Sequence, residues 1–132
     1  MLVEFEVKTD NKTDFVNITS EVENIVEQKK IKSGYCIVFV PHTTAAVTIN
    51  ESADPDVCQD IKYKLDNLIP WHDNYKHREG NSAAHIKTSL IGSSEKVIIA
   101  EKRLLLGTWQ GIFLTEFDGP RLRKVKVKIV KD

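Results

Sequence analysis

The feature that most constrains this sequence is a two-residue alternation at each end of the chain. Residues 124–129 alternate lysine with valine or isoleucine, and residues 2–8 place Val3, Phe5 and Val7 between mainly charged neighbours. Successive side chains of a β-strand point to opposite faces, so both segments are predicted to be strands with one buried face. The chain is therefore expected to begin and end in sheet structure whose other face meets water.

The lysine row formed by Lys124, Lys126 and Lys128 has more than one interpretation. It can be a solvated face, or an edge strand that its charge protects from pairing with another chain. Contact with nucleic acid is disfavoured, because 19 lysines and arginines balance 19 aspartates and glutamates and the net charge is zero. We therefore expect neither a nucleic-acid partner nor a membrane partner.

Apolar spacing and turn residues predict helices and further strands between these ends. Ser20 and Glu23 form a capping box before a helical pattern that Gly34 can end, and Asp54 followed by Pro55 is typical of a second helix start. This second helix is expected to stop near residue 70, before a polar loop over 71–80 and a short helix capped by Asn81. Strands are predicted over 35–40, 45–50, 96–100, 108–117 and 122–130.

Length and composition favour one domain over residues 1–132. The chain is 41% hydrophobic and has no apolar run long enough to span a membrane, nor the pattern of a signal peptide. The cysteines Cys36 and Cys58 lack a CxxC spacing and are interpreted as reduced, which favours the cytoplasm. The fold class is predicted to be α+β, with two groups of strands separated by two or three helices.

The first candidate functional segment is His42-Thr43-Thr44, a polar break between two apolar strands. A histidine here could bind a metal as neutral imidazole or move a proton near neutral pH. The alternative is that the two hydroxyls bond the backbone of the turn and that the imidazole is a satisfied turn residue. Asp54, further along, is better explained as a helix cap.

The second candidate is the pair His77 and His85, in the polar loop and in the short helix that follows it. Both imidazoles can approach one ion if the loop folds over the helix start. Their spacing matches no standard zinc pattern, and surface loops often carry histidines without a function. The metal site and the functionless loop both stay open on the residues alone.

Two further segments carry chemical groups near the carboxyl end. Residues 107–111 bracket Trp109 and Gln110 with glycines, which suits either close approach of a ligand or a tight bulge with a core indole. Around the following turn, Glu116 could ligate a cation or act as a base, and Arg121 could grip phosphate. An ordinary surface turn with a salt bridge explains the same residues.

Taken in order, three blocks resemble the YjbQ family of uncharacterised small proteins: VPHTTAAVTINESADPDV (40–57), HREGNSAAHIKTSLIGSS (77–94) and LLLGTWQGIFLTEFDGPR (104–121). The resemblance covers nearly the whole chain. It implies a compact α+β protein with a mixed, mostly antiparallel sheet, packed as a cytoplasmic homotrimer with its sites near subunit boundaries. It also implies activity as a secondary thiamine-phosphate synthase, a transferase that joins a pyrimidine pyrophosphate to a thiazole phosphate.

The same resemblance implies roles for residues at matched positions. Where other members often carry histidine after the glutamate, this chain has Phe117, so no imidazole acts there. A metal-dependent phosphate-ester hydrolase and a non-enzymatic trimer that binds a small ligand remain alternatives. The implied catalytic residues are His42, Glu116 and Arg121, those touching a phosphorylated substrate are Thr43, Thr44, Asn81, Trp109 and Gln110, and those holding a divalent metal (zinc, magnesium or manganese) are His42, His77 and His85.

Overall fold

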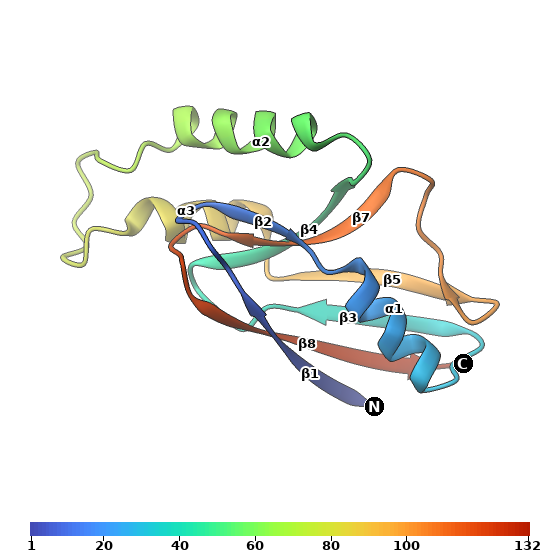
Figure 1. Ribbon diagram of the computed structural model, residues 1–132. Helices are drawn as coiled ribbons and strands as arrows, with labels where there is room; N and C mark the ends of the chain where they lie inside the picture. Colours follow the sequence, from blue (N-terminus) through green and yellow to red (C-terminus); the bar gives the residue numbers. More distant parts are fainter.

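Two antiparallel sheets, stacked on each other, form the body of the computed structural model, which describes residues 1–132 (Figure 1). The larger sheet has the order β1-β8-β3-β5-β6 and the smaller one β2-β7-β4. The α+β class is confirmed, and every strand pair is antiparallel rather than mixed. The elements are β1 (Leu2–Lys8), β2 (Asp14–Asn17), α1 (Thr19–Gln28), β3 (Gly34–Phe39), β4 (Ala45–Glu51), α2 (Pro55–Leu68), α3 (Ser82–Ile91), β5 (Ser94–Ala100), β6 (Arg103–Leu104), β7 (Gln110–Glu116) and β8 (Leu122–Lys131).

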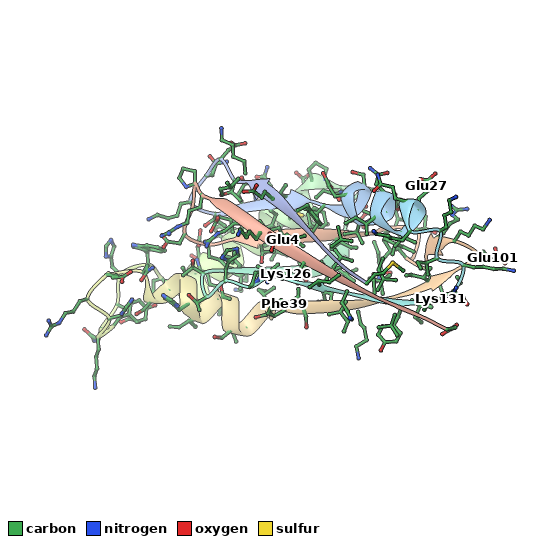
Figure 2. All side chains as sticks on the ribbon, turned by 90° about the horizontal axis from the view of Figure 1, so that it is seen from below. Glu4, Glu27, Phe39, Glu101, Lys126 and Lys131 are labelled. Carbon is green, nitrogen blue, oxygen red and sulfur yellow. The ribbon has the colours of Figure 1, made fainter.

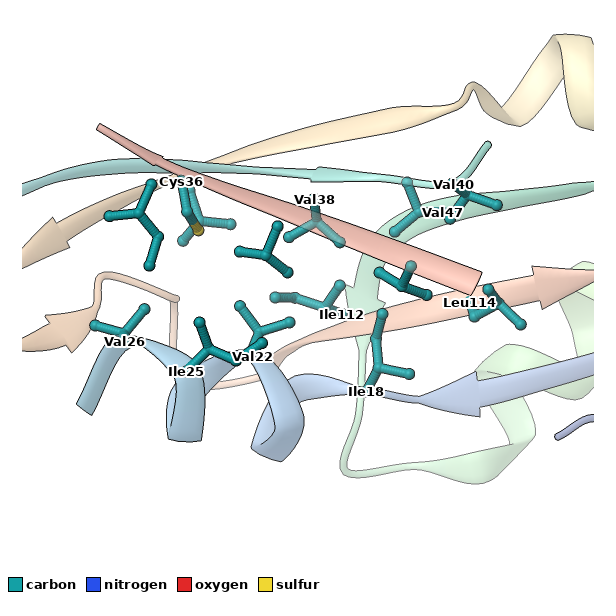
Figure 3. Packing of buried hydrophobic residues seen from close by; sticks show 14 of the residues in the cluster. Ile18, Val22, Ile25, Val26, Cys36, Val38, Val40, Val47, Ile112 and Leu114 are labelled. Carbon is teal, nitrogen blue, oxygen red and sulfur yellow. The ribbon is translucent and has the colours of Figure 1, made fainter. Parts of the chain in front are cut away.

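The core lies between the two sheets, with α1 closing one part of it (Figure 3). The predicted alternation holds, because Val125, Val127 and Ile129 of β8 are buried while the lysines between them face outward. Ile112 and Leu114 of β7 face them from the smaller sheet. Burying these branched side chains on inward faces provides the main stabilisation of the fold.

The outer face of the larger sheet carries both charges and exposed apolar side chains. Glu4, Lys126 and Phe39 lie side by side across β1, β8 and β3 (Figure 2). Tyr35 and Ile98 of the same sheet are also exposed. Since β8 lies between β1 and β3, the lysine row belongs to an interior strand, and its interpretation as a protected edge was wrong.

The first helix begins at Thr19, two residues earlier than a capping box with Ser20 as the N-cap predicts. Asn17 Oδ1 accepts the backbone N–H of Thr19 at 3.0 Å and so satisfies a free donor at the helix start. Ser20 does not cap, and its hydroxyl lies 3.5 Å from a carboxylate oxygen of Glu21 instead. The side chain of Asn17, three residues before Ser20, therefore satisfies the backbone at the helix start, although the N-cap position itself is Ile18.

The first helix also ends earlier, at Gln28, without using Gly34. Lys30 has a positive φ of 55° just after it. Gly34 instead opens β3 with φ of 144°, where an added Cβ would lie 2.1 Å from the carbonyl oxygen of Val130. Glycine is needed there for close approach of β3 to β8, not for stopping a helix.

The second and third helices cover the outer face of the smaller sheet. Asp54 caps α2 as predicted, with its side chain accepting the Asp56 N–H at 2.9 Å. No α2 residue is fully buried, and an ion pair of Lys87 with Asp66 joins α3 to α2. No helix of the structure is long and apolar enough to span a membrane.

Candidate functional site

An open cleft of about 770 Å³ lies at one end of the two-sheet body. It is bounded by the β3–β4 turn, the loop before α3, the start of α3 and the start of β8. Its charged lining residues are Arg121, Arg123 and Glu79. The cleft brings together seven of the residues predicted from the sequence: His42, Thr43, Thr44, His77, Asn81, His85 and Arg121.

A smaller hollow of about 300 Å³ adjoins the cleft and shares His42, Thr43, His85 and Ser93 with it. This hollow has no charged or apolar side chain in its lining, which hydroxyl groups and imidazoles dominate. The Thr88 hydroxyl, on α3, is buried without a hydrogen-bond partner. The two hollows together can therefore accept an anionic group beside an uncharged hydrogen-bonding group.

His42 is oriented by the first residues of β8. The backbone N–H of Lys124 donates to His42 Nε2 at 2.9 Å. Burial, and then the positive charge of Arg123, lower the pKa of His42 below its usual range, although the charge of Glu116 and a backbone hydrogen bond with Lys124 oppose them. The imidazole is thus held in place and favoured in its neutral form.

A buried ion pair of Glu116 with Arg123 closes the end of the core beneath the cleft. Arg123 Nε donates to Glu116 Oε1 at 2.8 Å, and Arg123 Nη2 donates to the Thr44 hydroxyl at 2.8 Å. Glu116 also accepts from the Thr9 hydroxyl at 2.9 Å and from the Asp118 N–H at 3.0 Å. The carboxylate predicted as a ligand or base is fully buried and does not line the cleft.

Arg121 and Asn81 meet at Asp118 on the rim. Arg121 Nη2 and Asn81 Nδ2 each donate to Asp118 Oδ2 at 2.9 Å. Asn81 occupies the N-cap position of α3 but makes no side-chain capping bond, so its predicted capping role was wrong. Its Oδ1 is buried without a partner. Asn81 thus fixes the rim instead of satisfying the helix start.

His77 and His85 lie with their ring centroids 5.4 Å apart and their planes nearly perpendicular. The loop does fold over the helix start, as the prediction of a shared ion required. Glu79 Oε2 lies 4.0 Å from His77 Nε2. No group of three or more histidine, cysteine, aspartate or glutamate side chains is arranged to hold a metal ion.

Trp109 and Gln110 lie away from the cleft, at the opposite end of β7. Gln110 is paired with Glu51 at the far end of β4, and its Oε1 accepts the Gly107 N–H at 2.8 Å. Trp109 is 62% exposed, so the indole is not a core residue. Within one chain, Trp109 and Gln110 therefore lie apart from the cleft histidines.

Arg123 is the buried charged residue of the cleft that the sequence analysis missed, and Glu79 on the loop before α3 was missed as well. It falls on the same alternate positions of β8 as the buried Val125 and Val127, and it is only 4% exposed. A charged residue on the apolar side of an alternating strand is the signal that could have found it, since buried charges require a partner.

The fold and the cleft define the class of this protein: a two-sheet α+β domain with a histidine- and arginine-lined cleft at one end. Comparison with known sequences refines this class. The family model "UPF0047 protein YjbQ-like" matches residues 3–132, so the chain belongs to the YjbQ/UPF0047 family.

Individual relatives match along nearly their whole length. A UPF0047 protein of Methanocaldococcus jannaschii is 50% identical over 100% of this chain and 96% of its own. The UPF0047 protein YugU of Bacillus subtilis is 47% identical over 98% and 99%, respectively.

Solved structures agree with the fold. A YjbQ/UPF0047 family protein from Clostridium acetobutylicum has a TM-score of 0.95 at 55% identity, covering 97% of this chain and 99% of its own. A protein of unknown function from Sulfolobus solfataricus has a TM-score of 0.96 at 36% identity, covering 100% and 97%.

Proposed function

We propose that the cleft binds a phosphorylated small molecule and that the protein acts as a transferase of the thiamine-phosphate synthase type. The observation that carries this proposal is the convergence of Arg121, Arg123 and three histidines on one open cleft with a single carboxylate, Glu79. Guanidinium groups and imidazole N–H groups are suited to phosphate oxygens. The adjoining uncharged hollow offers hydrogen bonds to a ring.

The proposed reaction needs charge neutralisation more than a nucleophile on the protein. The bond from the pyrimidine methylene carbon to the pyrophosphate oxygen breaks, and the leaving group keeps the electron pair. The thiazole nitrogen then forms a C–N bond to that carbon, and pyrophosphate is released. Arg121 would balance the charge that develops on the leaving group, and the cleft would hold both partners close together.

A divalent metal remains part of the proposal, restricted to His77 and His85. Their facing rings supply two nitrogen donors from separate segments, which suits zinc or manganese. His42 does not fit the donor set, because its Nε2 already accepts a backbone N–H. A bound ion would supply positive charge for pyrophosphate, with the remaining ligands coming from substrate or water.

We also propose a cytoplasmic homotrimer. Unpartnered apolar side chains on α2, with Tyr63 68% and Leu68 65% exposed, support burial against another copy. Association would also allow the exposed indole of Trp109 to pack against a second copy of the chain or against the ring of a ligand. Both cysteines are free thiols, which suits the cytoplasm. Light scattering should give three chains per particle, and Leu68→Glu should lower that number if α2 is the interface.

The transferase activity is tested by incubating the protein with the pyrimidine pyrophosphate and the thiazole phosphate and measuring thiamine phosphate and pyrophosphate. Arg121→Ala should lower kcat/KM about tenfold or more, as expected for loss of a charged contact to phosphate. Arg103→Ala, an exposed position on β6 outside the cleft, is the matched control. Absence of product from the unmodified protein, with and without added divalent ions, would contradict the transferase.

A further inference from the structure

We propose that His42 is a fixed hydrogen-bond donor through Nδ1 to an anionic oxygen of the ligand, and neither a metal ligand nor a general base. The inference concerns the division of labour among the three histidines of the cleft. It rests on the proposed function for the identity of the anionic oxygen, but its core is a property of the protein alone.

The first step is the contact between the Lys124 N–H and His42 Nε2 at 2.9 Å. An N–H group can donate only to a nitrogen with a free lone pair, so Nε2 carries no hydrogen. A neutral imidazole has one N–H, which must then be on Nδ1. A metal at Nδ1 would require loss of this hydrogen as well, and Nε2 is already engaged.

The second step is that the surroundings of His42 stabilise the neutral ring with its hydrogen on Nδ1. Lys124 belongs to β8, an interior strand held by β1 on one side and β3 on the other, so the donor is part of a fixed backbone. Protonation of Nε2 would break the bond and place a second positive charge near Arg123. Burial and the charge of Arg123 lower the pKa of His42, which favours the neutral ring, although a backbone hydrogen bond with Lys124 acts in the opposite direction.

The third step is the partner that Nδ1–H would meet. His42 and Arg123 both line the cleft. The bonds of Arg123 to protein use Nε and Nη2, which leaves Nη1 as the guanidinium nitrogen available to a ligand. Two donors held by buried structure suit an anionic oxygen such as that of phosphate or pyrophosphate.

The inference is tested by nitrogen NMR of the imidazole rings in the full chain, with inorganic pyrophosphate as the probe. Two-bond correlations from the ring protons identify which nitrogen carries hydrogen. We expect hydrogen on Nδ1 and a lone pair on Nε2 for His42, with the exposed His72 as the reference for an unrestrained ring. Pyrophosphate should then shift Nδ1 of His42.

Affinity measurements by calorimetry complete the test. His42→Ala should weaken pyrophosphate binding about tenfold, whereas His42→Asn, which can place an amide N–H near the position of Nδ1, should stay within about threefold of the unmodified protein. If His42→Ala does not fold, the resonances of the unmodified protein and His42→Asn decide the question.

The outcomes separate this inference from the proposed function. Hydrogen on Nε2 of His42 overturns the inference whatever the protein binds. Hydrogen on Nδ1, with pyrophosphate binding that shifts His85 and leaves His42 unchanged, also overturns it while phosphate binding stands. If pyrophosphate does not bind at all, the proposed function fails, and the donor role of His42 fails with it.

Discussion

At the scale of single residues, the pair Glu116 and Arg123 links the core to the cleft. Glu116 continues the inward positions of β7, and Arg123 continues those of β8. Two apolar faces therefore end in opposite charges that meet between the sheets. Thr9, Thr44 and the Asp118 backbone supply further hydrogen bonds to the pair, and only Nη1 of Arg123 makes no bond to protein. Burying two charges is tolerated because they are paired with each other and hydrogen-bonded by these groups.

Removing one partner of this ion pair should destabilise the protein more than replacing both partners with apolar residues. Glu116→Ala leaves the Arg123 guanidinium buried without its counter-charge and should lower the free energy of unfolding by about 3–5 kcal/mol. The double variant Glu116→Leu with Arg123→Met should lose less than Glu116→Ala alone. Urea unfolding of Glu116→Leu, of Arg123→Met and of the double variant measures the coupling. Additive losses would show that the two charges do not depend on each other.

At the scale of elements, sequence patterns located most helices and strands but not all of their ends. Asp54 was identified as a cap because an acidic residue directly before a proline is typical of a helix start. This signal needs no tertiary information. The short strands β2 and β6 were missed, since four and two residues are too few to show a period. The helix start moved from Ser20 to Thr19, beside the Asn17 side chain, because pairing of β2 with β7 sets where α1 begins.

The contact between α2 and α3 is asymmetric and should respond asymmetrically to substitution. Lys87 is 3% exposed, whereas the Asp66 side chain is 59% exposed. Asp66→Asn leaves a buried ammonium without its counter-charge and should cost about 2 kcal/mol of unfolding free energy. Lys87→Met replaces the ammonium with an apolar group and leaves a carboxylate in water.

Thermal or urea unfolding measures this difference, with Asp60→Asn as the matched control on the exposed side of α2. We expect Lys87→Met to cost less than Asp66→Asn and Asp60→Asn to cost almost nothing. The opposite order for the first two would show that the ammonium is solvated in the native protein.

At the scale of the whole molecule, the α+β class, the strands of the core and the set of cleft histidines could be predicted from the sequence. The positions of Trp109 and Gln110 could not, because β4 and β7 run the full length of the smaller sheet and place the block at 107–111 at its other end. The order of motifs along a chain does not give the distance between them in the folded protein. The buried position of Arg123 could have been predicted, because its place in the alternation of β8 puts it on the buried face of the strand.

The stability of the whole domain should fall at alkaline pH through Cys36. Burial of the thiol in β3 raises its pKa from 9.0 to about 11. The unfolded chain releases the proton near pH 9, whereas the folded chain keeps it, so the unfolded state binds fewer protons between these values. Unfolding free energy should therefore decline from pH 9 to 11, by about 2 kcal/mol in total.

Cys36→Ala isolates this contribution, because lysines and tyrosines titrate in the same range. Urea unfolding of both proteins from pH 8 to 11 should give a steeper decline for the unmodified chain, as the linkage relation requires. Parallel declines for the two proteins would mean that the Cys36 thiol ionises in the folded protein over the same pH range as in the unfolded chain.

The interior position of β8 sets when this fold can form during synthesis. β8 comes last among the strands, yet it stands between β1 and β3 in the larger sheet. While a ribosome is still making the last ten-residue strand, β1 has no partner and β3 lacks one of its two. The larger sheet is therefore completed only after translation has delivered β8, and until then the nascent chain exposes open edges of β1 and β3 that neighbouring chains could pair with.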